Sequence, residues 1–90
     1  MEYPTRNQLA QIKDWQGDYV ELMEFIRPIW MFEDVGYFRS RGRTYWLSTG
    51  GWSGNEEIIG YLKRNTLFWM MAWQRSSRGG HYVFKIPTLR

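Results

Sequence analysis

Cysteine is absent from this 90-residue chain, and histidine occurs only once, as His81. Without cysteine the chain forms no disulfide and offers no thiolate to a metal or a substrate. A single histidine also excludes a metal site built from several imidazoles. No apolar run reaches the ~18 residues that a membrane-spanning helix needs. The sequence therefore predicts no cofactor, no metal and no membrane partner.

The N-terminus lacks the features of an export signal. Residues 1–11 have no apolar core and no basic lead, so the expected compartment is the cytoplasm. The length predicts one domain spanning 1–90. Aromatic residues make up 19% of the chain, and their large rings allow a core to close in so short a sequence.

Acidic residues are scarce after the first third of the chain. Residues 1–34 carry seven acids and three bases, a net charge of −4, whereas residues 35–90 carry two acids and nine bases, a net charge of +7. This asymmetry predicts one acidic face and one basic face. Either the two faces neutralise each other across the fold, or the basic face contacts an anionic ligand.

Capping residues and apolar spacing predict three helices. The run from Thr5 to Gln8 has the spacing of a capping box and opens a helix over 5–15. Asp18 repeats the start signal, and apolar residues then recur at helical spacing until Pro28 interrupts them. The third helix, Asn55–Arg64, has acids in its first turn and bases in its last turn, as the helix dipole favours.

Aromatic and β-branched runs predict two hairpins. The first joins 36–39 to 44–47, and the second joins Leu67–Arg75 to His81–Ile86 through the turn Ser76–Gly80. The predicted fold is an α+β domain of order α-α-ββ-α-ββ. It has a four-stranded antiparallel sheet, made of two β-hairpins that flank a helix, with helices on one face.

The segment 67–75 is apolar on both faces of the predicted strand. Its alternate residues form two sets, Trp69, Met71 and Trp73 on one face and Phe68, Met70 and Ala72 on the other. Such a strand is expected in the core of the sheet. The alternative is an exposed aromatic and methionine patch that docks a partner.

The glycine-rich run Tyr45–Glu57 is the most informative motif. It passes from a predicted strand, through a loop that holds Gly50, Gly51 and Gly54, into a helix N-terminus. Free backbone N–H groups at such a turn suit an anion, and a left-handed φ is expected for at least one of the three glycines. The run is not a phosphate-loop signature, because no Gly-Lys-Ser/Thr follows. Either the turn is merely a tight connection, or it binds an anion or a nucleotide.

The start of the third helix has a specific expected cap. Ser53 and Glu56 have capping-box spacing, so the Ser53 hydroxyl is predicted to accept a hydrogen bond from the N–H of Glu56. A Glu56 carboxylate that reached back to the helix N-terminus would compete with a bound anion.

Arginines gather at both predicted hairpin turns. Arg39, Arg41 and Arg43 lie at the first tip, and Arg75 and Arg78 lie at the second. With aromatic residues nearby, these tips have the composition of a nucleic-acid contact, in which arginine binds phosphate and rings stack on bases. The alternative is that the charges keep the sheet edges soluble and unpaired.

Residues suited to catalysis are few. His81 could act as a general acid or base with Glu56 or Glu57 as its partner and Arg78 as an anion clamp, which are the parts of a small ribonuclease. A lone histidine beside a turn is more often simply exposed. The chain is therefore not expected to be an enzyme, and a ribonuclease is the lesser alternative.

Two runs, STGGWSGNEEII (Ser48–Ile59) and FWMMAWQRSSRGGHYVF (Phe68–Phe84), resemble a recurrent pattern in small uncharacterised bacteriophage proteins. The resemblance covers about half of the chain. It implies a phage-encoded protein in the cytoplasm of the host cell, where small phage proteins of this type often bind host factors, including defence components. The resemblance carries no known activity and assigns no functional residue.

These observations predict a non-enzymatic binding protein that captures a phosphate-bearing ligand, a nucleotide or a nucleic acid, and so counters host defence. The predicted ligand-binding residues come from the glycine-rich loop and the hairpin turns: Ser48, Thr49, Gly50, Gly51, Trp52, Ser53, Asn55, Arg43, Arg75, Arg78 and His81.

The rival hypothesis is an inhibitor or adaptor that binds a host protein through the acidic N-terminal helices or the aromatic surface. Homo-oligomers are left open. Convergence of Trp46, Trp52 and Arg78 on a pocket would favour the small ligand. Their dispersal beside an exposed apolar patch would favour the protein partner.

Overall fold

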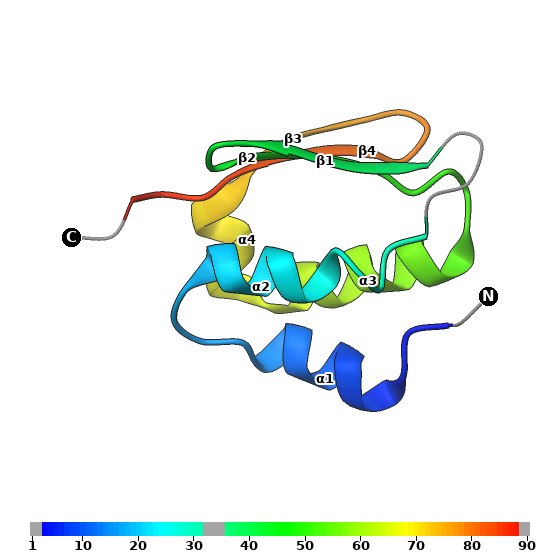
Figure 1. The fold of residues 1–90 in the computed structure, drawn as a ribbon, viewed down its shortest axis with the longest axis horizontal. Coiled ribbons are helices and arrows are strands. Elements are labelled where there is room, and N and C mark those ends of the chain that lie inside the picture. Colours follow the sequence, from blue (N-terminus) through cyan, green and yellow to red (C-terminus); the bar gives the residue numbers. More distant parts are fainter. Residues whose placement is uncertain (1–2, 32–35, 89–90) are drawn as a thin grey trace.

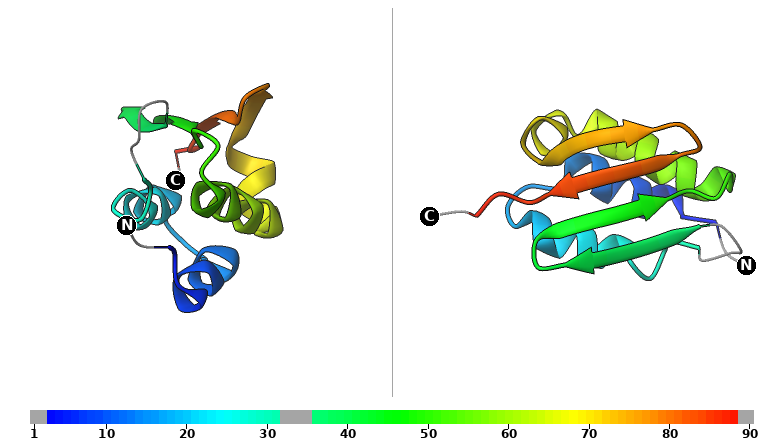
Figure 2. Two further views of the ribbon diagram at one scale, coloured as in Figure 1. Left: turned by 90° about the vertical axis from the view of Figure 1, so that its right-hand side faces the viewer. Right: turned by 90° about the horizontal axis from the view of Figure 1, so that it is seen from above.

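The computed structural model of the protein describes residues 3–31 and 36–88. In these residues an antiparallel sheet lies over the helices, of which the first along the chain lies farthest from the sheet, and all share one apolar core (Figure 1). The helices cover one face of the sheet, and no described helix lies on the other face (Figure 2).

Side-chain caps set the starts of the first two helices, α1 (Arg6–Asp14) and α2 (Tyr19–Ile26). Before α1, Thr5 Oγ1 accepts a hydrogen bond from the N–H of Gln8 at 3.0 Å, and Gln8 Oε1 accepts one from the N–H of Thr5 at 2.8 Å. The predicted capping box is confirmed. The second helix ends two residues before Pro28, as expected from the clash that proline imposes on a preceding helical turn.

The sheet contains two hairpins that meet at its centre. Its strands are β1 (Tyr37–Arg41), β2 (Thr44–Ser48), β3 (Trp73–Ser77) and β4 (His81–Lys85). They are all antiparallel neighbours in the order β1-β2-β4-β3, so β1 and β3 form the edges. The predicted α+β class and four-stranded antiparallel sheet are therefore confirmed.

One element differs from the prediction. The segment expected to be the long strand Leu67–Arg75 begins as a helix, α4 (Thr66–Ala72), and only its last residues belong to β3. Asn65 Oδ1 caps this helix by accepting a hydrogen bond from the N–H of Phe68 at 3.2 Å. The predicted alternation of two apolar strand faces is thus wrong, because the side-chain cap and core packing at helical spacing determine the local structure.

The core lies between the sheet and the helices. Phe68 and Ala72, four residues apart on α4, are both buried, as are Tyr45 on β2 and Phe84 on β4. Trp30 is also buried, and its indole N–H donates to the carbonyl oxygen of Ser48 at 3.2 Å. A chain of this length has few side chains for its core, and these large rings fill the space between the sheet and the helices.

A polar network fastens α2 to the first hairpin. Arg27 donates to both carboxylate oxygens of Glu24 at 3.0 Å and to Ser40 Oγ at 2.8 Å. The Tyr45 hydroxyl donates to the same carboxylate at 3.1 Å. The hydrogen bond from Arg27 lowers the pKa of Glu24, whereas burial, helped by the adjacent carboxylate, raises the pKa of Tyr45.

Candidate functional site

The glycine-rich loop joins β2 to the helix α3 (Ser53–Arg64) and is held by its own backbone. Gly50 and Gly51 have φ angles of +62° and +78°, which confirms the expected left-handed conformation. The N–H of Trp52 donates to the carbonyl oxygen of Thr49 at 3.1 Å, and the N–H of Gly51 donates to Thr49 Oγ1 at 3.3 Å. These two loop donors therefore have intramolecular partners.

Three polar residues of this region are buried. Ser48 and Thr49 have almost no exposed surface, and Asn55 has none. Asn55 Nδ2 donates to the carbonyl oxygens of Met31 at 3.0 Å and Thr49 at 3.3 Å, while its Oδ1 accepts from the N–H of Met31 at 3.0 Å. Asn55 thus links α3 to the segment that follows α2, and its polar atoms point into the protein.

The predicted Ser53 cap is wrong. The structural N-cap of α3 is Trp52, which makes no side-chain capping bond, and the N–H of Glu56 donates to the carbonyl oxygen of Trp52 at 3.1 Å. The helix starts one residue earlier than the capping pattern implied, so that amide already has a helical partner. The Ser53 hydroxyl hydrogen-bonds the hydroxyl of Tyr3, whose ring packs edge-on against Trp52.

The two hairpin turns lie at opposite ends of the sheet. In the register of β2 and β4, Ser48 pairs with His81 at the end that carries the glycine-rich loop. The turn with Arg78 is at this end. Arg43 is at the other end, where its Nε donates to the carbonyl oxygen of Ile86 at 2.9 Å. The structure therefore does not bring all the predicted ligand-binding residues together.

The face of the sheet turned away from the helices is its outer face (Figure 2). Alternate residues of the four strands form it, in three rows that run across the sheet. From the first turn toward the glycine-rich loop, the rows are Arg41, Thr44 and Lys85; Arg39, Trp46, Val83 and Arg75; and Tyr37, Ser48, His81 and Ser77.

The charged residues that the four strands place on the outer face have a single sign. The four strands contain no Asp or Glu. Arg39, Arg41, Arg75 and Lys85 are exposed, and none of them forms an ion pair with another residue in the described parts of the chain. All acids within 3–31 and 36–88 lie on the helices or at their caps. As far as residues 3–31 and 36–88 show, the outer face therefore presents positive charge to solvent without an acid beside it.

Aromatic rings lie among these cations. Trp46, in the central row, is 36% exposed. The guanidinium of Arg39 lies 4.7 Å from the centroid of the Tyr37 ring. Tyr37 and His81 stack with their centroids 6.1 Å apart, and the buried Ser48 lies between them in the register. Flat stacking surface and positive charge are thus interleaved on an open surface.

One ring nitrogen of His81, Nδ1, is buried without a hydrogen-bond partner among the described residues. The Nε2 edge lies beside Gly79, where an added Cβ would come within 3.2 Å. A buried polar atom without a partner is rare in folded proteins, and a bound ligand or an ordered water is the usual explanation.

A separate apolar surface lies on α4 and the start of β3. We define the α4 surface by four residues, Leu67, Met70, Met71 and Trp73, which are 58%, 75%, 41% and 40% exposed. Trp73 stacks on Trp69 with their centroids 6.2 Å apart. The exposed aromatic and methionine patch, which the sequence left as an alternative, is therefore present, and most of it lies on a helix.

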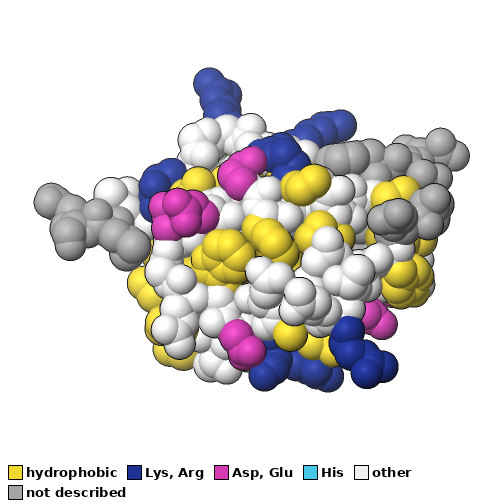
Figure 3. Space-filling view, turned by 60° about the horizontal axis from the view of Figure 1, so that its bottom comes forward, with side chains coloured by type: hydrophobic (Ala, Val, Ile, Leu, Met, Phe, Trp, Pro, Cys, Tyr) yellow, Lys and Arg dark blue, Asp and Glu magenta, His cyan; other side chains and the backbone are white. Residues whose placement is uncertain are grey.

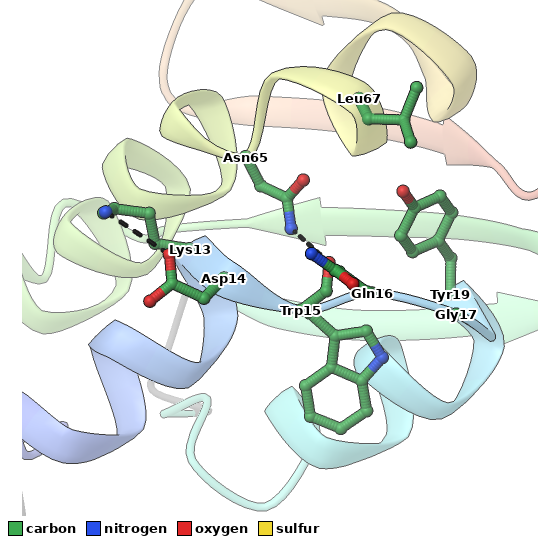
Figure 4. A pocket seen from close by; sticks show the side chains of 8 residues that line it. All are labelled: Lys13, Asp14, Trp15, Gln16, Gly17, Tyr19, Asn65 and Leu67. Atoms are coloured by element: carbon green, nitrogen blue, oxygen red, sulfur yellow. Dashed lines mark hydrogen bonds and ion pairs between the residues drawn. The ribbon is translucent and has the colours of Figure 1, made fainter.

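Cavities occur on the helical side of the molecule. One lies between α1 and α4, where the buried Asn65 donates from Nδ2 to the carbonyl oxygens of Ile12 and Trp15 at 3.0 and 3.1 Å (Figure 4). Hydrophobic side chains also gather along the middle of the helical side (Figure 3). A second cavity is lined by Tyr3, Gln8, Phe25, Pro28, Ile29 and Met31.

Trp46, Trp52 and Arg78 do not converge. Trp46 is on the outer face, Trp52 packs against Tyr3, and Arg78 is in the exposed β3–β4 turn. None of the three lines either cavity. This arrangement disfavours a pocket for a small ligand, and the exposed α4 surface favours a protein contact.

The outer face was not recognised as a unit in the sequence, although its three arginines were noted at the predicted hairpin turns. The alternation along a strand is a visible signal: Phe84 and Ile86 are buried, whereas Val83 and Lys85 between and beside them are more exposed. Which residues share a row across the sheet depends on strand order and register. The residue pattern of one strand carries no information on either.

Within residues 3–31 and 36–88, no helix has the length and hydrophobicity needed to cross a membrane. The same residues contain no cluster of three or more side chains suited to hold a metal ion. Comparisons with protein-family models, curated proteins and solved structures find no match to this chain.

Proposed function

We propose that the protein binds single-stranded nucleic acid on the outer face of its sheet. The observation that carries this proposal is a sheet face that, among the described residues, carries no acid and no covering helix, and on which Trp46 and the Tyr37–His81 pair lie among four cations without an ion pair to a described residue. Proteins that bind single strands combine positive grooves or surfaces with rings on which bases stack.

The spacing of the outer face suits consecutive nucleotides. Neighbouring rows are two residues apart along a strand, which corresponds to about 7 Å. One base would stack on Trp46 in the central row and the next on the Tyr37–His81 pair. Arg39, Arg41, Arg75 and Lys85 would bind the phosphates. Of the residues predicted from the sequence, Arg75, His81 and the buried Ser48 belong to this face.

An extended polymer is better supported than a free nucleotide. The glycine-rich loop uses its polar side chains and several of its amides internally, whereas the outer face is open across all four strands. The resemblance to phage proteins implies that this binding takes place in an infected cell. It would then counter a host defence that acts on or through nucleic acid.

The test is fluorescence anisotropy with labelled oligo-dT and oligo-U. If four cations contact phosphates, the slope of log affinity against log salt should be about −3, a loss of roughly 50-fold between about 50 and 200 mM salt. Arg39→Glu should weaken binding strongly. The matched control is Arg6→Glu, which makes the same charge change at an exposed position on α1.

The same samples test the ribonuclease alternative. Because His81 lies on the proposed surface, bound RNA would pass close to a possible acid or base. Gel electrophoresis should show that the RNA stays intact after prolonged incubation. Absence of binding to both oligonucleotides at low salt would reject the proposed function.

A further inference from the structure

The central row of the outer face differs from the rows on either side, because its two middle positions are both apolar. Trp46 on β2 and Val83 on β4 are direct partners in the register of the sheet. Arg39 lies beside Trp46 on the edge strand β1, and Arg75 lies beside Val83 on the edge strand β3. The row therefore consists of a ring and a branched aliphatic side chain, with an arginine at each end.

The fold does not use Trp46 and Val83 in its core. Trp46 is 36% exposed and makes no ring contact or hydrogen bond with a described residue. Val83 is half-buried, but it is not one of the half-buried apolar residues that pack against the core. Their neighbours along the two strands, Leu47 and Phe84, are the ones buried in the core. The pair thus leaves apolar surface open on the outer face (Figure 2).

The other rings of this face already have partners. The guanidinium of Arg39 lies 4.7 Å from the centroid of the Tyr37 ring, and Tyr37 stacks with His81. This contact also directs Arg39 toward Tyr37, rather than across Trp46, where an arginine could bind the O6 and N7 atoms of a guanine. Trp46 is therefore the open stacking platform of the face, and Val83 is the side chain that a base on this platform meets.

The chemistry of Val83 determines which base suits this position. Directly paired residues on one face of a sheet have Cβ atoms about 5 Å apart, so a base stacked on the Trp46 indole would have one edge against the Val83 methyl groups. Valine neither donates nor accepts a hydrogen bond, and contact with it therefore favours an apolar base edge. Thymine presents a methyl group at C5, whereas uracil has only a hydrogen atom on this carbon.

We infer that Trp46 and Val83 form a subsite for thymine, and that Val83 makes the protein prefer thymine-bearing single-stranded DNA to strands that carry uracil. This inference rests on the proposed function, because a base reaches Val83 only if the strand lies on the outer face. In the central row the arginines bind phosphates and Trp46 stacks on any base, so the contact with Val83 is the one that distinguishes thymine.

The experiment compares oligo-dT, oligo-dU and oligo-U of equal length in competition anisotropy at low salt. Oligo-dT and oligo-dU differ only in the C5 methyl group, whereas oligo-dU and oligo-U differ only in the 2′-hydroxyl group. The burial of one methyl group corresponds to a preference of about fourfold for oligo-dT over oligo-dU. Oligo-dU and oligo-U should bind with similar affinity.

Val83→Thr tests the residue itself. It replaces one methyl group with a hydroxyl group and keeps a β-branched side chain in the strand. It should remove most of the preference for oligo-dT and leave the affinity for oligo-dU little changed. The matched control is Val20→Thr on α2, which packs against the core on the helical side and should keep the wild-type preference. Because the preference is a ratio of two affinities measured on one sample, it does not depend on the fraction of a variant that is folded.

The outcomes separate this inference from the proposed function. Equal wild-type affinity for oligo-dT and oligo-dU would overturn the thymine subsite and leave nucleic-acid binding intact, and so would a Val83→Thr protein that keeps the wild-type preference. If oligo-dU binds as tightly as oligo-dT and only oligo-U binds more weakly, the protein distinguishes the sugar and not the base methyl group. If none of the three binds at low salt, the proposed function fails and the subsite with it.

Discussion

Replacing Asn55 tests whether this glycine-rich loop residue is part of the framework or a ligand contact. Its side chain is fully buried and makes three hydrogen bonds, two with the backbone of Met31 and one with the carbonyl oxygen of Thr49. Asn55→Ala removes all three and leaves the N–H of Met31 without its acceptor. At about 1 kcal/mol for each bond, the expected loss of folding free energy is roughly 2–4 kcal/mol.

The assay is thermal unfolding followed by circular dichroism. For a domain of this size, a loss of 1 kcal/mol lowers Tm by about 4–8 °C, so Asn55→Ala should unfold at least ~10 °C below the wild type. Asn55→Asp should be no better, because it would direct a carboxylate at two carbonyl oxygens. The control is Asn7→Ala, at an exposed position on α1, which should change Tm little.

The result that would refute this reasoning is an Asn55→Ala protein that melts with the wild type but no longer binds oligonucleotides. Asn55 would then be a ligand contact, as its place in the loop first suggested. If Asn55 belongs to the framework, the fraction of Asn55→Ala molecules that is folded at low temperature should bind oligonucleotides with wild-type affinity.

Three further predictions concern the loop junction, pH and the outer face. Gly80→Ala should lower folding free energy by about 1 kcal/mol or more in urea titrations, because its φ is +79° and a Cβ would lie 2.3 Å from Thr49 Oγ1; an unchanged midpoint would contradict the loop contact. Arg27 lowers the pKa of Glu24, so their pair stabilises the fold above the ordinary carboxyl pKa of 4.5 and loses this effect as pH falls through the lowered value. In urea titrations the free energy of unfolding of the wild type should therefore fall more steeply in acid than that of Glu24→Gln. The difference should be about 1 kcal/mol or less because the pair is partly exposed, and parallel pH profiles of the two proteins would argue against the pair. Trp46→Ala should weaken oligonucleotide binding about tenfold with little change in Tm, and the opposite pattern would make Trp46 structural.

The sequence allowed most of the fold to be predicted wherever local signals agreed with tertiary packing. The capping box at Thr5 and Gln8 is a contact within one helical turn, so its residues determine it. The alternation of the buried Phe84 and Ile86 with less buried neighbours follows from the two-residue period of a strand. The cap at Ser53 was mispredicted because the same pattern fits helix starts one residue apart.

The α4 helix shows where local signals were ambiguous. The run from Leu67 to Ala72 is apolar throughout, so its periodicity fits a buried strand as well as a helix. Asn65 resolves the ambiguity in the structure. It caps the helix and also donates to the carbonyl oxygens of Ile12, in α1, and of Trp15, the C-cap of α1, which are 53 and 50 positions earlier in the chain. Those partners can be identified only once the fold is known.

By itself, the sequence determined the composition of the candidate surface: strands without acids, arginines beside aromatic rings, and a tight glycine turn. These properties are local, because they depend on residue type and on neighbours along the chain. Only the tertiary structure decided which of these residues share a surface. The order β1-β2-β4-β3 and its register placed Arg39, Trp46 and Arg75 in one row, and separated Arg43 from Arg78. Register is a relation between strands distant in sequence, set by how the whole inner face packs against the helices.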